Sequence, residues 1–199
     1  MPLKIAVLIY DDVAALDFTG PMEVFNAVQY FKFGDVDMYT VATNDNVVTC
    51  MSGLKIIPDH TMETSPVPDI LLIPGNADPT PQINDPRLTN WLKQTAPKCR
   101  WVFGVCTGTL ILAATGLLKG KKMTTHWSAI EALDSIPEIT ALENVRHVCD
   151  GNLLTSAGVG AGIDAALWLI GRLYSPQQAR EVQKGLEYYP VPPYAAEVP

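Results

Sequence analysis

Short, continuous apolar runs separated by helical stretches constrain the fold of this chain most strongly. Three of them, at residues 4–10, 69–73 and 101–103, are too short for independent helices and lack the alternation of a half-exposed strand. Such runs are typical of parallel strands that helices cover on both faces. Because helical segments lie between the runs, the sequence predicts one α/β domain over residues 1–199 with a mostly parallel central sheet.

The remaining elements follow from periodicity and from turn residues. Further strands are predicted at 36–42 and 122–126, with an edge element at 54–58 and a hairpin over 144–155 that turns at Asp150-Gly151. Helices are predicted at 20–30, 85–95, 108–116, 128–135, 161–174 and 176–188. We expect Thr19 to cap the first helix, with Pro21 in its first turn. The proline-rich tail, residues 189–199, is expected to be extended.

Composition narrows the class of protein. The chain is 48% hydrophobic and 18% charged, as in compact globular proteins. Its 14 basic and 21 acidic side chains argue against nucleic acid and membrane surfaces as partners. The start of the sequence lacks a signal-peptide pattern, and the cysteines at 50, 99, 106 and 149 lack Cys-x-x-Cys spacing. We therefore expect reduced thiols in a cytoplasmic protein, with no zinc site or redox dithiol.

Residues 104–108 read Gly-Val-Cys-Thr-Gly and join the apolar run at 101–103 to a second apolar run from Thr109. A buried strand that enters a helix through such a turn is typical of a nucleophile elbow, here with sulfur in place of the usual hydroxyl. The glycines are needed where strand and helix nearly touch. We expect Cys106 to lie at the positive end of a helix dipole, which stabilises the thiolate. The alternative is a buried, inert cysteine.

Two other segments are predicted to reach the same edge of the sheet, since ligands of such folds bind outside the carboxyl ends of the strands. The loop after the first strand carries Asp17, and Pro74-Gly75-Asn76 follows the run at 69–73. A protonated Asp17 beside the sulfur would donate a hydrogen bond to it. Otherwise Asp17 only caps a helix. The N–H groups of Gly75 and Asn76 are expected to join the Thr107 N–H in binding a developing negative charge, unless they form an ordinary turn.

Two more polar side chains belong to the predicted site. Thr107 directly follows the cysteine and either orients Asp17 or caps the next helix. His126 ends the strand predicted at 122–126 and is either a supporting group or a core imidazole. His60 and His147 have no spacing that suggests a set of metal ligands, so no metal is expected.

These motifs together resemble the DJ-one/PfpI superfamily, nearly from end to end. The matching stretches are 16–21, 73–75, 105–108, 116–118, 124–127, 150–155 and 161–164. Within the superfamily the chain is most similar to isocyanide hydratases, which share Cys-Thr-Gly at the turn, an aspartate after the first strand and a close like Leu186-Glu187-Tyr188. The resemblance implies a flavodoxin-like three-layer sandwich with helices on both faces, a homodimer, and no cofactor.

The resemblance also implies roles for individual residues. It makes Cys106 the nucleophile, Asp17 its acid/base partner and Thr107 a supporting hydroxyl, and it places Val159 and Gly160 in the wall of the pocket. The chain departs from the hydratases at Asn76, where they tend to have a second glycine. It departs again at Ser156-Ala157, where they have a glycine-rich approach to the late helix.

The absence of histidines at two positions narrows the range of reactions that this chain is expected to catalyse. The protease branch of the superfamily has a histidine where this chain has Thr107, and class I amidotransferases need a late histidine, which is absent after His147. A cysteine with one carboxylic acid suits addition to an electrophilic carbon without a leaving group. The predicted reaction is hydration of a small-molecule isocyanide to an N-substituted formamide, through a thioimidate on Cys106. The alternatives are a glyoxalase or deglycase that acts on small dicarbonyls, and a redox or ligand sensor without turnover.

Overall fold

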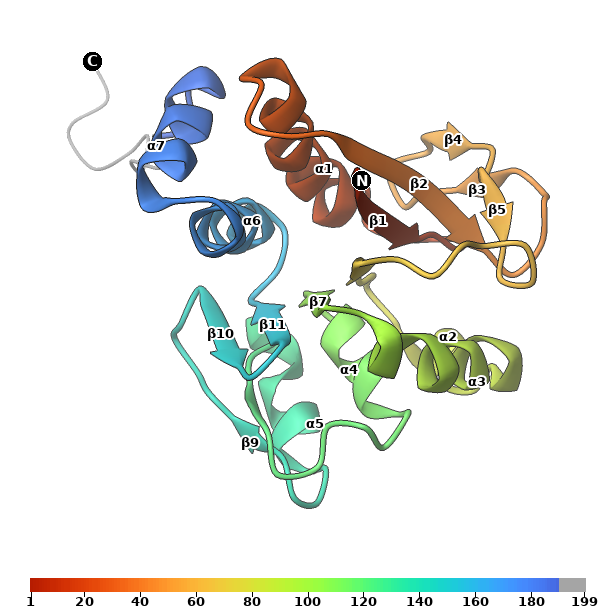
Figure 1. Cartoon of the computed structure of the whole chain (residues 1–199). Helices are drawn as coiled ribbons and strands as arrows, with labels where there is room; N and C mark the ends of the chain where they lie inside the picture. The colour runs from red at the N-terminus through yellow and green to blue at the C-terminus, as the bar shows by residue number, and fades with distance from the viewer. Residues whose placement is uncertain (190–199) are drawn as a thin grey trace, which may run out of the picture.

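A seven-stranded sheet forms the centre of the computed structural model, which describes residues 1–189 (Figure 1). In spatial order its strands are β10 (His147–Asp150), β11 (Leu153–Ser156), β7 (Trp101–Val105), β6 (Ile70–Ile73), β1 (Leu3–Leu8), β2 (Val36–Ala42) and β5 (His60–Thr61). All neighbours pair in parallel except β10, which forms an antiparallel hairpin with β11. The mostly parallel sheet and the hairpin are confirmed.

Helices cover both faces of the sheet, as predicted (Figure 1). One face carries α1 (Ala15–Tyr30), α6 (Gly160–Leu173) and α7 (Pro176–Gly185), which pack on one another. The other carries α2 (Thr80–Ile83), α3 (Pro86–Thr95) and α4 (Gly108–Ala113), and α5 (Ile130–Asp134) lies beyond α4. The predicted tail falls almost wholly outside the described residues. Within residues 1–189 no helix combines the length and the apolar character needed to cross a bilayer.

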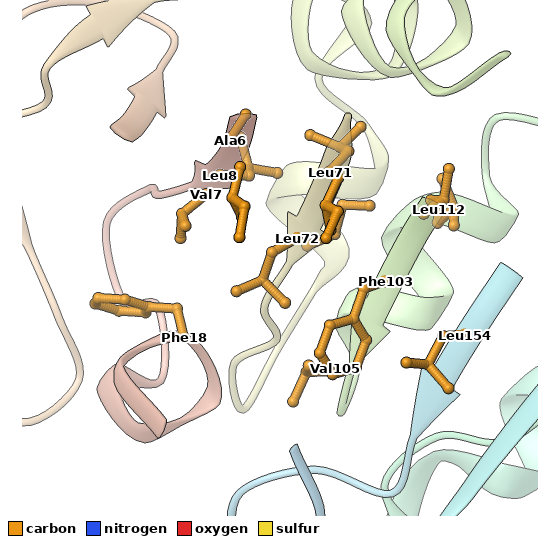
Figure 2. Close-up of a cluster of buried hydrophobic side chains, with 14 of the residues drawn as sticks. Ala6, Val7, Leu8, Phe18, Leu71, Leu72, Phe103, Val105, Leu112 and Leu154 are labelled. Carbon is orange, nitrogen blue, oxygen red and sulfur yellow. The ribbon is translucent and has the colours of Figure 1, made fainter. Parts of the chain in front are cut away.

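The core lies between these layers because the strands are apolar on both sides. Residues 5–9 of β1 and its extension, and all of β6, are fully buried. Figure 2 shows side chains of β1, β6, β7 and β11 next to one another, with Phe18 of α1 and Leu112 of α4 among them. Burial on both faces explains why these strands read as continuous apolar runs. It also fixes the positions of the strand ends that carry the polar residues described below.

Two small sheets lie outside the central one. β3 (Val48–Thr49) pairs antiparallel with β4 (Lys55–Ile56), and β8 (Lys122–Met123) pairs in parallel with β9 (Thr140–Ala141). The strand predicted at 122–126 is therefore wrong beyond Met123. The Thr124 N–H donates to the Thr155 side chain at 3.0 Å, so this segment bonds to a side chain of β11 and not to a strand backbone.

The first helix begins earlier than predicted. α1 starts at Ala15, so Thr19 does not cap it: the Thr19 hydroxyl donates to the Ala15 carbonyl at 2.8 Å, and Pro21 lies inside the helix. The prediction failed because Gly20-Pro21 looks like a helix start. In the fold Gly20 serves close packing instead, since a Cβ there would lie 2.8 Å from Ile163 of α6. As a result Asp17 belongs to the first turn of α1.

Candidate active site

Cys106 occupies a strained turn between β7 and α4. Its φ is 58°, a left-handed conformation that non-glycine residues rarely adopt. Neighbouring strands and loops hold this backbone in place: the Cys106 N–H donates to the Ser156 carbonyl at 3.1 Å, and the Thr125 hydroxyl donates to the Cys106 carbonyl at 2.7 Å. The turn directs the cysteine away from the line of the strand, at the carboxyl edge of the sheet.

Three glycines pack tightly around this turn. A Cβ on Gly108 would lie 2.0 Å from the Ile73 carbonyl oxygen, and one on Gly75 would lie 2.5 Å from the Thr107 nitrogen. Gly158 has a φ of +101°, and a Cβ there would lie 2.6 Å from the Cys106 Cβ. Real side chains do not fit at such distances, so each glycine allows a close approach of backbone to the turn. The predicted need for glycine is confirmed at Gly108, where the close neighbour is the adjacent strand β6.

Asp17 lies beside Cys106 and is fully buried. Its carboxylate accepts two backbone hydrogen bonds, from the Gly75 N–H to Oδ2 at 3.0 Å and from the Val159 N–H to Oδ1 at 2.8 Å. Burial raises the pKa of Asp17, whereas the hydrogen bonds from Val159, Gly75 and the Cys106 side chain lower it. The charge of His126 lowers it further. The site thus contains a buried acid whose ionised form has defined donors.

The sulfur and the carboxyl compete for ionisation. Burial first, and then the charge of Asp17, raise the pKa of Cys106 to about 12, although the Thr107 N–H opposes the shift. Desolvation and the like charge of Asp17 thus favour the thiol, in the opposite direction to the stabilisation of the thiolate expected from the helix. A buried thiolate beside a buried carboxylate is costly, so this arrangement favours a Cys106–Asp17 pair that holds one proton over a pair that holds none.

The predicted binding groups at Gly75 and Asn76 are already occupied, whereas the Thr107 N–H lowers the pKa of the Cys106 thiol. The Gly75 N–H is bound to Asp17, and the Asn76 N–H donates to the Thr107 hydroxyl at 2.8 Å. That hydroxyl donates in turn to the Asn76 carbonyl at 2.7 Å. Thr107 therefore holds the turn after β6; it does not orient Asp17, and within residues 1–189 it makes no side-chain helix cap. The two amides are not free donors for a developing negative charge.

Residues at the start of α6 contact the site through the backbone. Val159 has a φ of 47°, unusual for a β-branched residue, and gives its N–H to Asp17. Its side chain is exposed, and Gly160, the first residue of α6, is partly buried. His126 is partly buried, and its Nδ1 lies 2.8 Å from the Ser128 hydroxyl. The structure therefore brings Val159 and His126 close to Asp17.

Two neighbours of the pair were missed from the sequence. Gly158 packs against the sulfur, and only its place between Ala157 and the late helix could have suggested this. Tyr10 follows β1 and donates from its hydroxyl to the Pro74 carbonyl at 2.7 Å. Burial, followed by the charges of Asp17 and Cys106, raises its pKa well above its usual value. Within residues 1–189 no group of three or more potential metal ligands is gathered at one place.

Comparisons with known proteins agree with this architecture. The DJ-1/PfpI family model matches residues 3–171. An isonitrile hydratase from Pseudomonas putida is 39% identical over 98% of this chain and 82% of its own length. An HTH-type transcriptional regulator from Pseudomonas aeruginosa, CdhR, is 27% identical over 89% of this chain and 52% of its own length.

Comparisons with solved structures also agree with this architecture. The crystal structure of a ThiJ/PfpI family protein from Pseudomonas syringae has a TM-score of 0.89 and 34% identity, covering 100% of this chain and 80% of its own. Drosophila melanogaster DJ-1beta superimposes with a TM-score of 0.82 at 21% identity, over 95% of this chain and 100% of its own, a likeness of fold. The chain belongs to the DJ-1/PfpI family.

Proposed function

We propose that this protein hydrates isocyanides (isonitriles) to N-substituted formamides, with Cys106 as nucleophile and Asp17 as the group that moves the proton. The observation that carries the proposal is the pairing of the two side chains at a strained turn, where each raises or lowers the pKa of the other. The similarity to an isonitrile hydratase over almost the whole chain supports it. The positive φ of Cys106 supports the interpretation of its turn as a nucleophile elbow.

The first step is addition of the thiol across the terminal carbon of the isocyanide. Asp17 takes the proton from Cys106 as the sulfur bonds to that carbon, and then gives the proton to the same carbon. The product is a thioimidate, in which the carbon carries the sulfur, one hydrogen and a double bond to nitrogen. Asp17 is left ionised, and its carboxylate keeps the hydrogen bonds from Gly75 and Val159.

The second step is hydrolysis of the thioimidate. The ionised Asp17 removes one proton from water as the oxygen attacks the carbon, and then passes that proton to the nitrogen. The resulting tetrahedral carbon expels the sulfur and becomes the formamide carbonyl, and the proton of its hydroxyl returns to the Cys106–Asp17 pair. Overall one water is added and no group leaves the substrate, so no acid for a departing amine is required. This agrees with Thr107 in the position where a histidine would be needed for amide hydrolysis.

The burial of the sulfur favours a slender reacting group. Cys106 is only 6% exposed. An isocyanide presents a linear, two-atom end whose reacting carbon carries no substituent, whereas a dicarbonyl presents a carbon with three. The N–H groups of Gly75, Asn76 and Val159 are engaged within the protein, so a reacting group that needs few hydrogen bonds is favoured.

The test is a product assay with 4-nitrophenyl and cyclohexyl isocyanide. We expect the purified protein to form the corresponding formamides with multiple turnovers, followed by proton NMR. Methylglyoxal serves as the comparison substrate under the same conditions, and its turnover should be far slower. Efficient turnover of methylglyoxal without formamide production would replace hydration by the glyoxalase alternative. Oxidation of Cys106 by peroxide with no turnover of either compound would favour a sensor.

A further inference from the structure

The turn that leads into α6 carries unusual strain for a segment that contributes only backbone to the site. Gly158 and Val159 both have positive φ values, of 101° and 47°. Backbone in such regions persists only where the surroundings over-determine it. The Val159 N–H depends on this geometry to reach Asp17 at 2.8 Å. The groups that hold the turn therefore influence the hydrogen bond from Val159 to Asp17, although none of them contacts the Asp17–Cys106 pair itself.

Contacts from outside the turn hold it on both sides. Before it, the Ala157 N–H donates to the Arg146 carbonyl at 2.9 Å. After it, the Tyr188 hydroxyl donates to the carbonyl of Gly160, the first residue of α6, at 3.1 Å. The Arg146 side chain forms an ion pair with Asp164 one turn further along α6. These contacts join the segments before β10 and after α7 to the start of α6.

Tyr188 is itself held in place by the chain that precedes it. Its N–H donates to the Gln183 carbonyl at 3.1 Å, and the Gln183 side chain donates to the Tyr188 carbonyl at 3.1 Å. Glu187 has a φ of 50°, which turns the chain sharply after α7. The tyrosine is thus a fixed support for the first turn of α6, and it is well suited to hold a strained neighbour.

We propose that Tyr188 is a positioning residue for the Asp17–Cys106 pair, because its hydrogen bond to Gly160 keeps the Val159 N–H on the Asp17 carboxylate. The effect of Tyr188 on turnover rests on the proposed function, whereas its effect on the position of the Val159 N–H does not. The Tyr188 hydroxyl bonds to the Gly160 carbonyl and acts through the backbone of 159–160. Its role is to favour the ionised form of Asp17, which takes the proton from Cys106 in the first step and from water in the second.

The expected pH effect has a definite sign. The hydrogen bond from Val159 lowers the pKa of Asp17, so a loosened turn raises that pKa. The other groups that face Asp17 are the Cys106 thiol, Tyr10, the Gly75 N–H and His126. None of them lies on α6 or α7, so a change at Tyr188 leaves their own supports intact. The acid limb of kcat/KM should therefore move to higher pH.

The experiment compares Tyr188→Phe, which removes only the hydroxyl, with Tyr189→Phe as the matched control. Hydrogen exchange followed by NMR on the full chain should show several-fold faster exchange of the Val159 amide in Tyr188→Phe and unchanged exchange in the strands of the core. In the same variant kcat should fall several-fold with KM little changed. The acid limb should rise by about half a pH unit, the shift expected for partial loss of one hydrogen bond to a carboxylate.

The outcomes separate the two proposals. Unchanged exchange at Val159 in a folded Tyr188→Phe protein would overturn the positioning role, and so would faster exchange spread evenly over the whole core. An unshifted pH profile in an active Tyr188→Phe protein would also contradict it. If the wild-type protein does not turn over isocyanides, the proposed function fails, and the exchange of the Val159 amide still decides the role of Tyr188. Asp164→Asn, which weakens the second support, should speed exchange at the same amide.

Discussion

Two cysteines lie at opposite ends of β7 and are buried to the same extent, yet their surroundings differ. Cys99 precedes the strand, Cys106 follows it, and each is 6% exposed. Cys99 has ordinary backbone angles, with a φ of −81°, and its thiol donates to the Thr95 carbonyl at 3.2 Å. Burial, followed by the charge of Asp69, raises its pKa to about 11. It behaves as a small hydrophobic residue with a satisfied donor.

Cys106 shares the burial of Cys99 but has three features that Cys99 lacks. Its backbone is held in the left-handed region, glycine backbone approaches it closely, and its sulfur contacts a carboxylate that itself accepts two amides. Burial alone raises a thiol pKa and makes it inert. The comparison teaches that a neighbouring carboxylate, and not exposure or a low pKa, distinguishes the sulfur that we propose to be reactive from the one that we do not.

The largest expected effect comes from removing each sulfur in turn. Cys106→Ala should reduce formamide production by roughly 10⁴-fold or more, because the covalent route is lost. Cys99→Ala should leave kcat within about twofold of wild type, since its sulfur has only a packing role. Steady-state kinetics with 4-nitrophenyl isocyanide measure both. Comparable losses in the two variants would mean that the cysteines act on stability alone.

The two carboxylates beside the cysteines provide the next contrast. Asp17→Asn should lower kcat/KM by about 10²- to 10⁴-fold, the usual range for loss of a general acid/base group. Asp69→Asn is the control: its carboxylate accepts the Lys4 N–H at 2.9 Å at the opposite edge of the sheet, so activity should be retained. Near-normal turnover by a folded Asp17→Asn protein would remove the carboxylate from the mechanism.

A third prediction concerns the charge that opposes the thiolate. The Asp17 carboxylate raises the pKa of Cys106, so Asp17→Asn should lower that pKa by roughly one unit. Alkylation by iodoacetamide as a function of pH, read by mass spectrometry of the separate cysteine peptides, gives the shift for each thiol. The Cys99 profile should not change, and an equal shift at both sites would point to general loosening of the fold.

The smallest expected effect is a difference in stability between variants of two buried threonines, Thr107 and Thr109, which flank Gly108. The Thr107 hydroxyl bonds to both backbone groups of Asn76, so Thr107→Val should reduce the free energy of unfolding by about 1–3 kcal/mol. The Thr109 hydroxyl has no hydrogen-bond partner within the described part of the chain, so Thr109→Val should be neutral or slightly stabilising. Urea unfolding measures both, and the reverse order would contradict the role given to Thr107.

The sequence predicted those parts of the fold that depend on local pattern. Strands buried on both faces read as apolar runs, and the hairpin turn at Asp150-Gly151 was visible as residue chemistry. The start of α1 could not be predicted in this way, because its first residues follow Ala14, which offers no side-chain cap within the described residues. Burial of Asp17 inside that first turn depends on packing against distant segments, which no local pattern reports.

In the candidate site, too, local sequence patterns were predictive and contacts between distant segments were not. Cys106 and Asp17 were predicted to lie at one edge of the sheet, since each follows the carboxyl end of a predicted parallel strand. The occupied amides of Gly75 and Asn76 and the donor role of Val159 could not be read from the sequence, because they depend on backbone contacts between residues far apart along the chain. The homodimer and the cytoplasmic location stay predictions.

The most direct measurement is the intact mass of the protein in rapid-quench samples with 4-nitrophenyl isocyanide. The account predicts a transient species heavier by one isocyanide, located on the Cys106 peptide and followed by release of the formamide. The species should be absent in Cys106→Ser and present in Cys99→Ser. Formamide production at full rate without any adduct, or an adduct that persists in Cys106→Ser, would contradict the claim that this sulfur carries the reaction.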